Sequence, residues 1–122
     1  MTTMIRKIAG ALLALTFAAA AGAARAEPTM AEYTASSGSE RQVLSLYLFA
    51  QDAAYGWANT VLDDRKQPRL YCMARNEAHT SEQVTALVDG FAAKHSNVDL
   101  SKYNLGLILL TALQETYPCP AK

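Results

Sequence analysis

Two cysteines, Cys72 and Cys119, constrain the fold of this 122-residue chain more than any other feature. Each stands close behind an aromatic residue, Cys72 directly after Tyr71 and Cys119 two positions after Tyr117. An even number of cysteines in an exported protein usually indicates that they are paired in disulfides, because compartments outside the cytoplasm are oxidising. We therefore predict a Cys72–Cys119 bridge, which would close a long loop and contribute about 4 kcal/mol to the stability of a small domain.

Export itself is predicted by residues 1–26, which have the features of a secretory signal peptide. Two basic residues precede an apolar stretch at residues 8–20, and the small residues that follow end in an A-x-A pattern at residues 24–26. We predict cleavage after Ala26 and a periplasmic location. The apolar stretch falls short of the roughly 20 residues that span a bilayer, so we expect no stable membrane anchor after cleavage.

The charge of the predicted mature chain argues against two classes of partner. The full sequence holds 11 basic and 11 acidic residues. Arg6, Lys7 and Arg25 lie in the signal peptide and no acidic residue does, which leaves 8 basic residues against 11 acidic ones, a net charge of −3. A mildly acidic domain without a cluster of Lys and Arg binds nucleic acid and anionic lipid poorly. We expect neither as a partner.

The apolar periodicity predicts an all-α fold, a small bundle of three main helices stapled by one disulfide. Residues 27–38 are polar and rich in small residues, and we interpret them as a flexible leader with one short helical turn at residues 30–33. The helical domain is predicted over residues 39–122. Its first helix, at 39–64, is expected to begin with a capping box formed by Ser39 and Gln42.

That first helix carries an apolar stripe at helical spacing, which indicates a packed face. The stripe consists of Val43, Leu46, Tyr47, Ala50, Ala54, Trp57 and Val61. Leu44, Leu48 and Leu62 lie off the stripe, so we expect the helix to pack on more than one side. Gly56 lowers helix stability by up to ~1 kcal/mol relative to alanine. The close approach of another helix beside Trp57 would explain why a glycine occurs at this position.

Two further helices are predicted after an irregular segment. The first starts at Thr80, where Thr80 and Gln83 match a capping box, and ends near Lys94. Its apolar face comprises Val84, Leu87, Val88 and Phe91. The second spans residues 101–116 and is apolar nearly all round, which predicts a central, buried helix. Tyr117-Pro118 ends it, because proline cannot continue the hydrogen-bond ladder.

The sequence offers little for catalysis or metal binding. Cys72, His79, His95 and Cys119 lack the spacing of a zinc site, and the predicted disulfide consumes both thiols. We find no G-x-S-x-G elbow and no glycine-rich phosphate loop. The carboxylates of Asp63, Asp64, Glu77 and Glu82 are interpreted as solvated charges at helix ends. We predict no enzyme, no metal and no cofactor. Tyr47, Tyr55 and Trp57 could line a ligand pocket, but we favour ordinary packing.

Several features together resemble the Rap/Tai family, periplasmic immunity proteins against type VI secretion amidase effectors. They are Tyr71-Cys72, the capped helix from Thr80 to Phe91, a loop with His95, and the apolar helix closing on Ala112-Leu113 and Tyr117-Pro118-Cys119. The similarity covers residues 43–119. Where many members have a proline, this chain has Met73-Ala74 after the first cysteine and Ser96 after the histidine. Both departures lie in loops that would contact a partner, so they leave the particular partner open.

The resemblance implies a small helical domain, commonly a homodimer, that binds and inhibits a peptidoglycan amidase. In that family a loop between helices plugs the catalytic cleft of the enzyme. Carried onto this chain, the plug would be residues 95–102, with His95, Ser96, Asn97, Asp99, Ser101 and Lys102 as partner-binding residues. A short loop held by capped helices loses little entropy on binding. Two alternatives stay open: a periplasmic helical chaperone active under acid stress, and a housekeeping protein that shares the fold.

Overall fold

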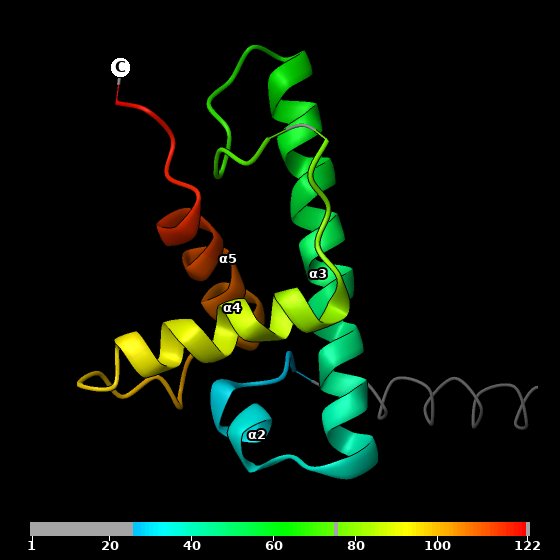
Figure 1. Cartoon of the computed structure of the whole chain (residues 1–122), viewed down its shortest axis with the longest axis vertical. Coiled ribbons are helices and arrows are strands. Elements are labelled where there is room, and N and C mark those ends of the chain that lie inside the picture. The colour runs from blue at the N-terminus through cyan, green and yellow to red at the C-terminus, as the bar shows by residue number, and fades with distance from the viewer. Residues whose placement is uncertain (1–25, 75, 122) are drawn as a thin grey trace, which may run out of the picture.

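The computed structural model describes residues 26–74 and 76–121, which form four helices and no strand. A short helix, α2 (Met30–Ala35), precedes the long α3 (Gly38–Asp64), and α4 (Ser81–Lys94) and α5 (Leu105–Thr116) follow. In Figure 1, α3 runs along the long axis of the molecule and α4 lies across it. The predicted all-α class is confirmed. The predicted signal peptide lies outside the described residues except for Ala26. No helix within the described ranges is long and apolar enough to cross a membrane.

The bundle is built around α5, which is the central, buried helix that its composition predicts. Leu105, Leu109 and Leu113 on α5 are fully buried. Leu48 of α3 and Val84 and Val88 of α4 are equally inaccessible and belong to the same apolar cluster. Burial of each such side chain contributes roughly 1.5–3 kcal/mol. Three helices therefore share one core.

The observed start of α4 agrees with the start predicted from the sequence, whereas the observed starts of α3 and α5 differ from the predicted ones. The capping box of Thr80 and Gln83 is present in both directions. The capping box predicted at Ser39 is wrong, because α3 begins earlier, at Gly38. Its N-cap residue, Ser37, makes no side-chain capping bond. Gly38 has φ +55°, a conformation that favours glycine and turns the chain from α2 into α3. The predicted start of α5 at residue 101 is also early, since the helix begins at Leu105.

Residues 27–38 are a folded part of the domain, so the prediction of a flexible leader is wrong. The helical turn expected at residues 30–33 belongs to α2, whose side chains Met30 and Tyr33 are buried in the core. The Tyr33 hydroxyl donates to Asp89 of α4 over 2.9 Å, and Arg41 of α3 lies 3.9 Å from the ring centre. Two buried side chains are enough to fix a short segment whose overall composition is polar.

The apolar stripe predicted as a packed face of α3 lies mostly on the outside. Leu44 and Leu48 point into the core instead, whereas Val43, Leu46 and Trp57 are 65%, 66% and 72% exposed. Gly56 has no atom within 4 Å of the position of a Cβ atom, so none of the helices that the structure describes approaches it closely. We call the exposed residues Val43, Leu46, Ala50, Trp57 and Val61 the outer face of α3.

The close helix contact occurs at Gly106 of α5. A Cβ atom there would lie 3.2 Å from the Tyr55 hydroxyl and 3.3 Å from both Gln51 Nε2 and the Tyr47 hydroxyl. The Tyr55 hydroxyl donates to the carbonyl of Gly106 over 2.7 Å. Tyr47 and Tyr55 therefore pack against α5, while Trp57 lies on the outer face. These three rings do not form one ligand pocket.

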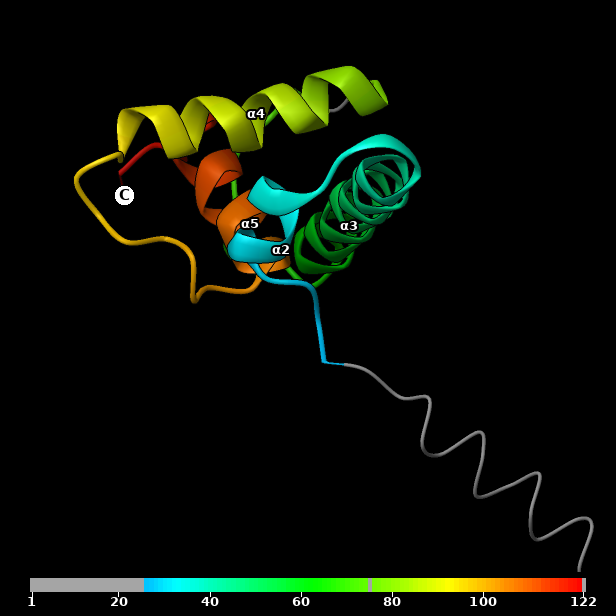
Figure 2. The same cartoon turned by 90° about the horizontal axis from the view of Figure 1, so that it is seen from below.

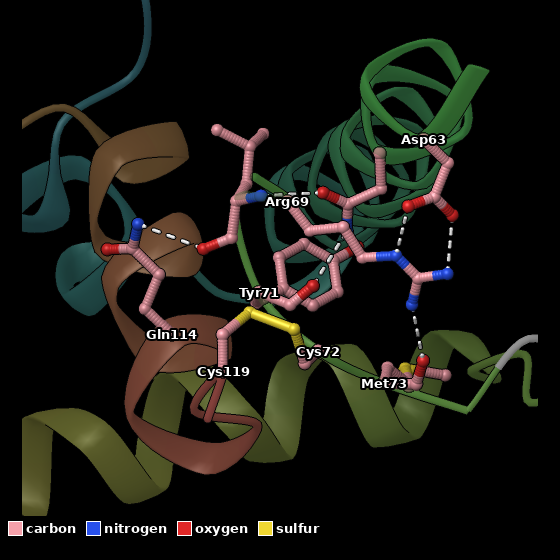
Figure 3. Close-up of a disulfide and its surroundings, with 9 residues drawn as sticks. Asp63, Arg69, Tyr71, Cys72, Met73, Gln114 and Cys119 are labelled. Atoms are coloured by element: carbon pink, nitrogen blue, oxygen red, sulfur yellow. Dashed lines mark hydrogen bonds and ion pairs between the residues drawn. A yellow bond between two sulfur atoms is a disulfide. The ribbon is translucent and has the colours of Figure 1, made fainter. Parts of the chain in front are cut away.

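The predicted disulfide between Cys72 and Cys119 is confirmed, with Cα atoms 4.8 Å apart and a sequence separation of 47. It joins the segment after α3 to the tail after α5, and Figure 3 shows the bonds around it. Cys72 N donates to the carbonyl of Tyr117 over 2.8 Å. Gln114 of α5 donates to the carbonyl of Leu70. Residues 70–72 are thus fastened to α5 and to the tail that follows it.

Candidate functional site

The loop between α4 and α5, residues 95–104, projects from the end of α4 that lies away from α3 (Figures 1 and 2). It contains every residue predicted to bind a partner. Ser96, Asn97, Asp99, Ser101 and Lys102 are exposed, and His95 is half-buried. Val98 and Tyr103 are also exposed, each by 47%. The sequence reasoning missed these two, although an isolated valine and tyrosine in a polar loop are a usable signal.

The loop begins at His95, which is fixed against the helices on either side. Its ring lies 4.3 Å from that of Phe91 on α4, and its Nε2 is 2.7 Å from Glu115 Oε2 on α5. Lys94 forms an ion pair with the same carboxylate. Hydrogen bonds from Lys94 and then His95 hold the pKa of Glu115 below its usual range. His95 therefore serves first as an anchor of the loop.

The middle of the loop is shaped by Asp99. Its Oδ1 accepts from the backbone N–H of Ser101 over 3.1 Å and from the Ser101 hydroxyl over 2.5 Å. The same bonds hold the pKa of the Asp99 carboxyl below its usual range. A side chain that accepts from a backbone N–H two residues on forms an Asx turn, which fixes the local chain direction. Asp99 and Ser101 are thus engaged with each other.

The end of the loop is braced by the segment that enters α2. Met30 N donates to the carbonyl of Tyr103 over 2.9 Å, and Ala31 N donates to that of Ser101 over 3.1 Å. Leu105 N in turn donates to the carbonyl of Pro28 over 2.7 Å. This brace explains why α5 starts at Leu105, since the preceding residues bond outside the helix. The loop is anchored at both ends, and Asn97, Val98 and Lys102 remain exposed near its tip.

A second candidate site is a groove beside the C-terminal half of α3, which we call the α3 groove. It has a volume of about 580 Å³ and lies between α3 and the segment of residues 69–79. Phe49, Ala53, Trp57 and Met73 give it apolar walls. Asp52, Asp63, Asp64 and Glu77 bring carboxylates to it, and Arg69 a guanidinium. The sequence reasoning missed the groove, because it forms only where an irregular segment returns along α3.

His79 lies at one end of this groove in a half-buried polar triad. Its Nδ1 is 2.9 Å from Asp52 Oδ1, and its Nε2 is 2.9 Å from the Tyr117 hydroxyl. The imidazole thus bridges Asp52 of α3 and Tyr117 of the tail after α5. Burial, and then Glu77 and Asp52, raise the pKa of Tyr117. The neighbouring Cys72 is held in the disulfide, so the triad orients no thiol. Its evident role is to tie α3, α4 and the tail together.

Within the described residues, no three His, Cys, Asp or Glu side chains are grouped to hold a metal ion.

The chain matches no protein-family model, no curated protein and no solved structure. Its function therefore has to be argued from the geometry of these two sites.

Proposed function

We propose that this chain is a periplasmic immunity protein that inhibits a peptidoglycan amidase effector of type VI secretion by inserting the α4–α5 loop into the active-site cleft. The observation that carries the proposal is the loop itself, which projects from the bundle and is braced at both ends. A preorganised loop binds without a large loss of conformational entropy. The resemblance of residues 43–119 to the Rap/Tai family supports the same role.

The exposed part of the loop suits the cleft of an enzyme that binds peptides. Asn97 offers an amide, Lys102 an ammonium group, and Val98 and Tyr103 offer apolar surface. Recognition sites commonly combine an apolar contact with a few polar groups that fix orientation. The loop would exclude substrate from the cleft without chemistry of its own. Inhibition is then purely a matter of binding.

The test compares two triple variants of the mature protein, residues 27–122, against the amidase. Asn97→Ala, Val98→Ala and Lys102→Ala together remove the exposed groups of the loop tip. Because the loop is anchored elsewhere, we expect inhibition to weaken by at least about tenfold while the melting temperature stays within a few degrees of wild type.

The control removes the same kinds of group elsewhere: a side-chain amide, a valine side chain and an ammonium group. Gln67→Ala, Val61→Ala and Lys66→Ala lie near the end of α3, where all three residues are exposed. Val61 is 46% exposed, much as Val98 is. We expect this variant to inhibit like wild type. Equal inhibition by the tip variant and the control would reject the loop as the plug.

The outer face of α3 supports a second element of the proposal, a homodimer. Monomeric proteins expose few contiguous apolar patches of several hundred Å². A second copy on Val43 and Leu46 would remove this surface from water. Sedimentation velocity should then detect a dimer, and Leu46→Glu should yield a folded monomer. A protein that is monomeric at all concentrations would reject the homodimer but would leave the proposed role of the α4–α5 loop unaffected.

The same outer face favours the alternative of a periplasmic chaperone, since exposed apolar side chains can hold unfolded clients. The two functions differ in acid, where protonation of carboxylates would activate a chaperone of this kind. We expect no protection of an acid-denatured client and no rise in binding of an apolar dye. Clear client protection in acid would favour the chaperone.

A further inference from the structure

The α3 groove is held open by a fixed floor and wall. Asn59 is 9% exposed, and its Oδ1 accepts from Leu70 N over 2.7 Å while its Nδ2 donates to the carbonyl of Tyr71 over 3.1 Å. On the wall, Arg69 pairs with Asp63 through both Nε and Nη2, and its Nη1 donates to the carbonyl of Met73 (Figure 3). These bonds fix the returning segment at a set distance from α3. A ligand would therefore meet a preformed site.

Gly56 and Trp57 give the groove room and an apolar wall. Trp57 is 72% exposed, a high value for the largest apolar side chain. Gly56 precedes it in the middle of a 27-residue helix, with open space where a side chain would stand. No contact among the described residues requires a glycine there, although glycine weakens a helix. Its effect is to leave the backbone of α3 accessible from the groove.

Among the residues that the structure describes, the charges that line the groove are unbalanced towards the acidic side. Arg69 is bonded to Asp63, and His79 to Asp52. Asp64 and Glu77 also line the groove, and neither carboxylate forms a hydrogen bond or ion pair with any residue that the structure describes. An exposed indole and two available carboxylates thus border the same space.

A lysine or arginine side chain has the chemistry that fits this combination. Its aliphatic stem packs on an apolar surface while its charged head stays at the edge, and a cation is attracted to the face of an indole. We infer that the α3 groove binds a basic segment of another protein, a lysine or arginine flanked by apolar residues. The volume of about 580 Å³ lies in the range of sites that enclose a ligand of a few side chains.

This site is separate from the plug and does not depend on it. The groove ends at His79, just before α4, whereas the loop of residues 95–104 follows the other end of α4. A helix of 14 residues is about 21 Å long. One partner can therefore occupy the groove while another holds the loop. Val43 and Leu46, on which a second copy would pack, do not line the groove.

Trp57 is the only tryptophan of the chain, so its fluorescence reports on the groove directly. The probes are two capped hexapeptides, one alternating Lys with Leu and the other alternating Glu with Leu. We expect the basic peptide to change the Trp57 emission saturably and the acidic peptide to leave it unchanged. Because the attraction is between charges, salt should weaken the binding.

Two variants separate binding from folding. Gly56→Ala fills the open space and should weaken binding of the basic peptide roughly tenfold, although it should raise the melting temperature. Asp64→Asn with Glu77→Gln should weaken binding to a similar extent. The matched control, Glu40→Gln with Glu82→Gln, removes two exposed carboxylates outside the groove and should bind like wild type.

Three results would overturn the inference. The first is an equal response to the basic and the acidic peptide. The second is unchanged binding by the Gly56→Ala protein. The third is a Trp57 emission that shifts with protein concentration even in the Leu46→Glu protein, which lacks the proposed dimer contact at Val43 and Leu46, because a second copy would then be filling the groove.

Discussion

Gly56 and Gly106 allow one substitution to be tested at two positions with opposite expected signs. Both lie within helices of the same small domain, and both become alanine. At Gly56 the new methyl group enters open space. At Gly106 it meets Tyr55, Gln51 and Tyr47 at 3.2–3.3 Å. The comparison therefore isolates tertiary packing from the intrinsic helix preference, which is the same in both cases.

The magnitudes follow from the contacts. Gly56→Ala should raise the free energy of unfolding by about 0.5–1 kcal/mol through helix propensity alone. Gly106→Ala has the same propensity benefit. It must also displace the Tyr55 hydroxyl, which weakens a hydrogen bond of about 1 kcal/mol, and it adds overpacking of about 1–3 kcal/mol. We expect a net loss of roughly 1–3 kcal/mol.

Urea unfolding followed by circular dichroism measures both variants, and thermal unfolding gives a second reading. Each kcal/mol corresponds to about 4–8 °C in melting temperature for a domain of this size. A Gly106→Ala protein as stable as the Gly56→Ala protein would refute the close approach of α3 and α5. A destabilised Gly56→Ala protein would refute the open space beside Trp57.

Three further predictions concern the disulfide, the buried residue Met30 and the stability at alkaline pH. Cys72→Ser with Cys119→Ser should lower the free energy of unfolding by about 4 kcal/mol, as measured by urea unfolding, and two reactive thiols in the native wild-type protein would contradict the bridge. Met30→Ala should cost about 2–4 kcal/mol because Met30 is buried, whereas a flexible leader would tolerate the change without effect. Burial raises the pKa of Tyr33 and of Tyr71 from 10.0 to about 12. Their contribution to stability should therefore be complete below pH 10 and be lost as the pH rises towards 12, at roughly 2–3 kcal/mol each. Urea titrations across this range should show a smaller fall for Tyr33→Phe, and an identical fall would contradict the assignment.

The features that the sequence predicted correctly are those set by local chemistry. The capping box of Thr80 and Gln83 lies within four consecutive residues, so it needs no knowledge of the remaining fold. The apolar composition of residues 105–113 predicts a buried helix, and this prediction does not require knowing which other helices pack around it. The Cys72–Cys119 pair was predictable because these are the only two cysteines in the chain.

The errors arose where partners distant in sequence decide the structure. Residues 101–104 have no strong helix stop, and the carbonyls of Ser101 and Tyr103 are instead bonded to residues 30 and 31, before the start of α5. The outer face of α3 and its buried side are both apolar, so periodicity alone could not show which one meets α5. The two sites differ in the same way: the projecting loop could be expected from its polar residues, whereas the groove required the return path of residues 69–79.

Inhibition of an amidase through the α4–α5 loop can be tested by a pull-down with the mature protein, residues 27–122, against the secreted proteins of its own organism. We expect one tight partner that cleaves peptidoglycan peptides and stops doing so in the complex. We also expect the triple variant at Asn97, Val98 and Lys102 to lose this partner and the control at Val61, Lys66 and Gln67 to keep it. A folded, disulfide-bonded protein that captures no such enzyme would contradict the account.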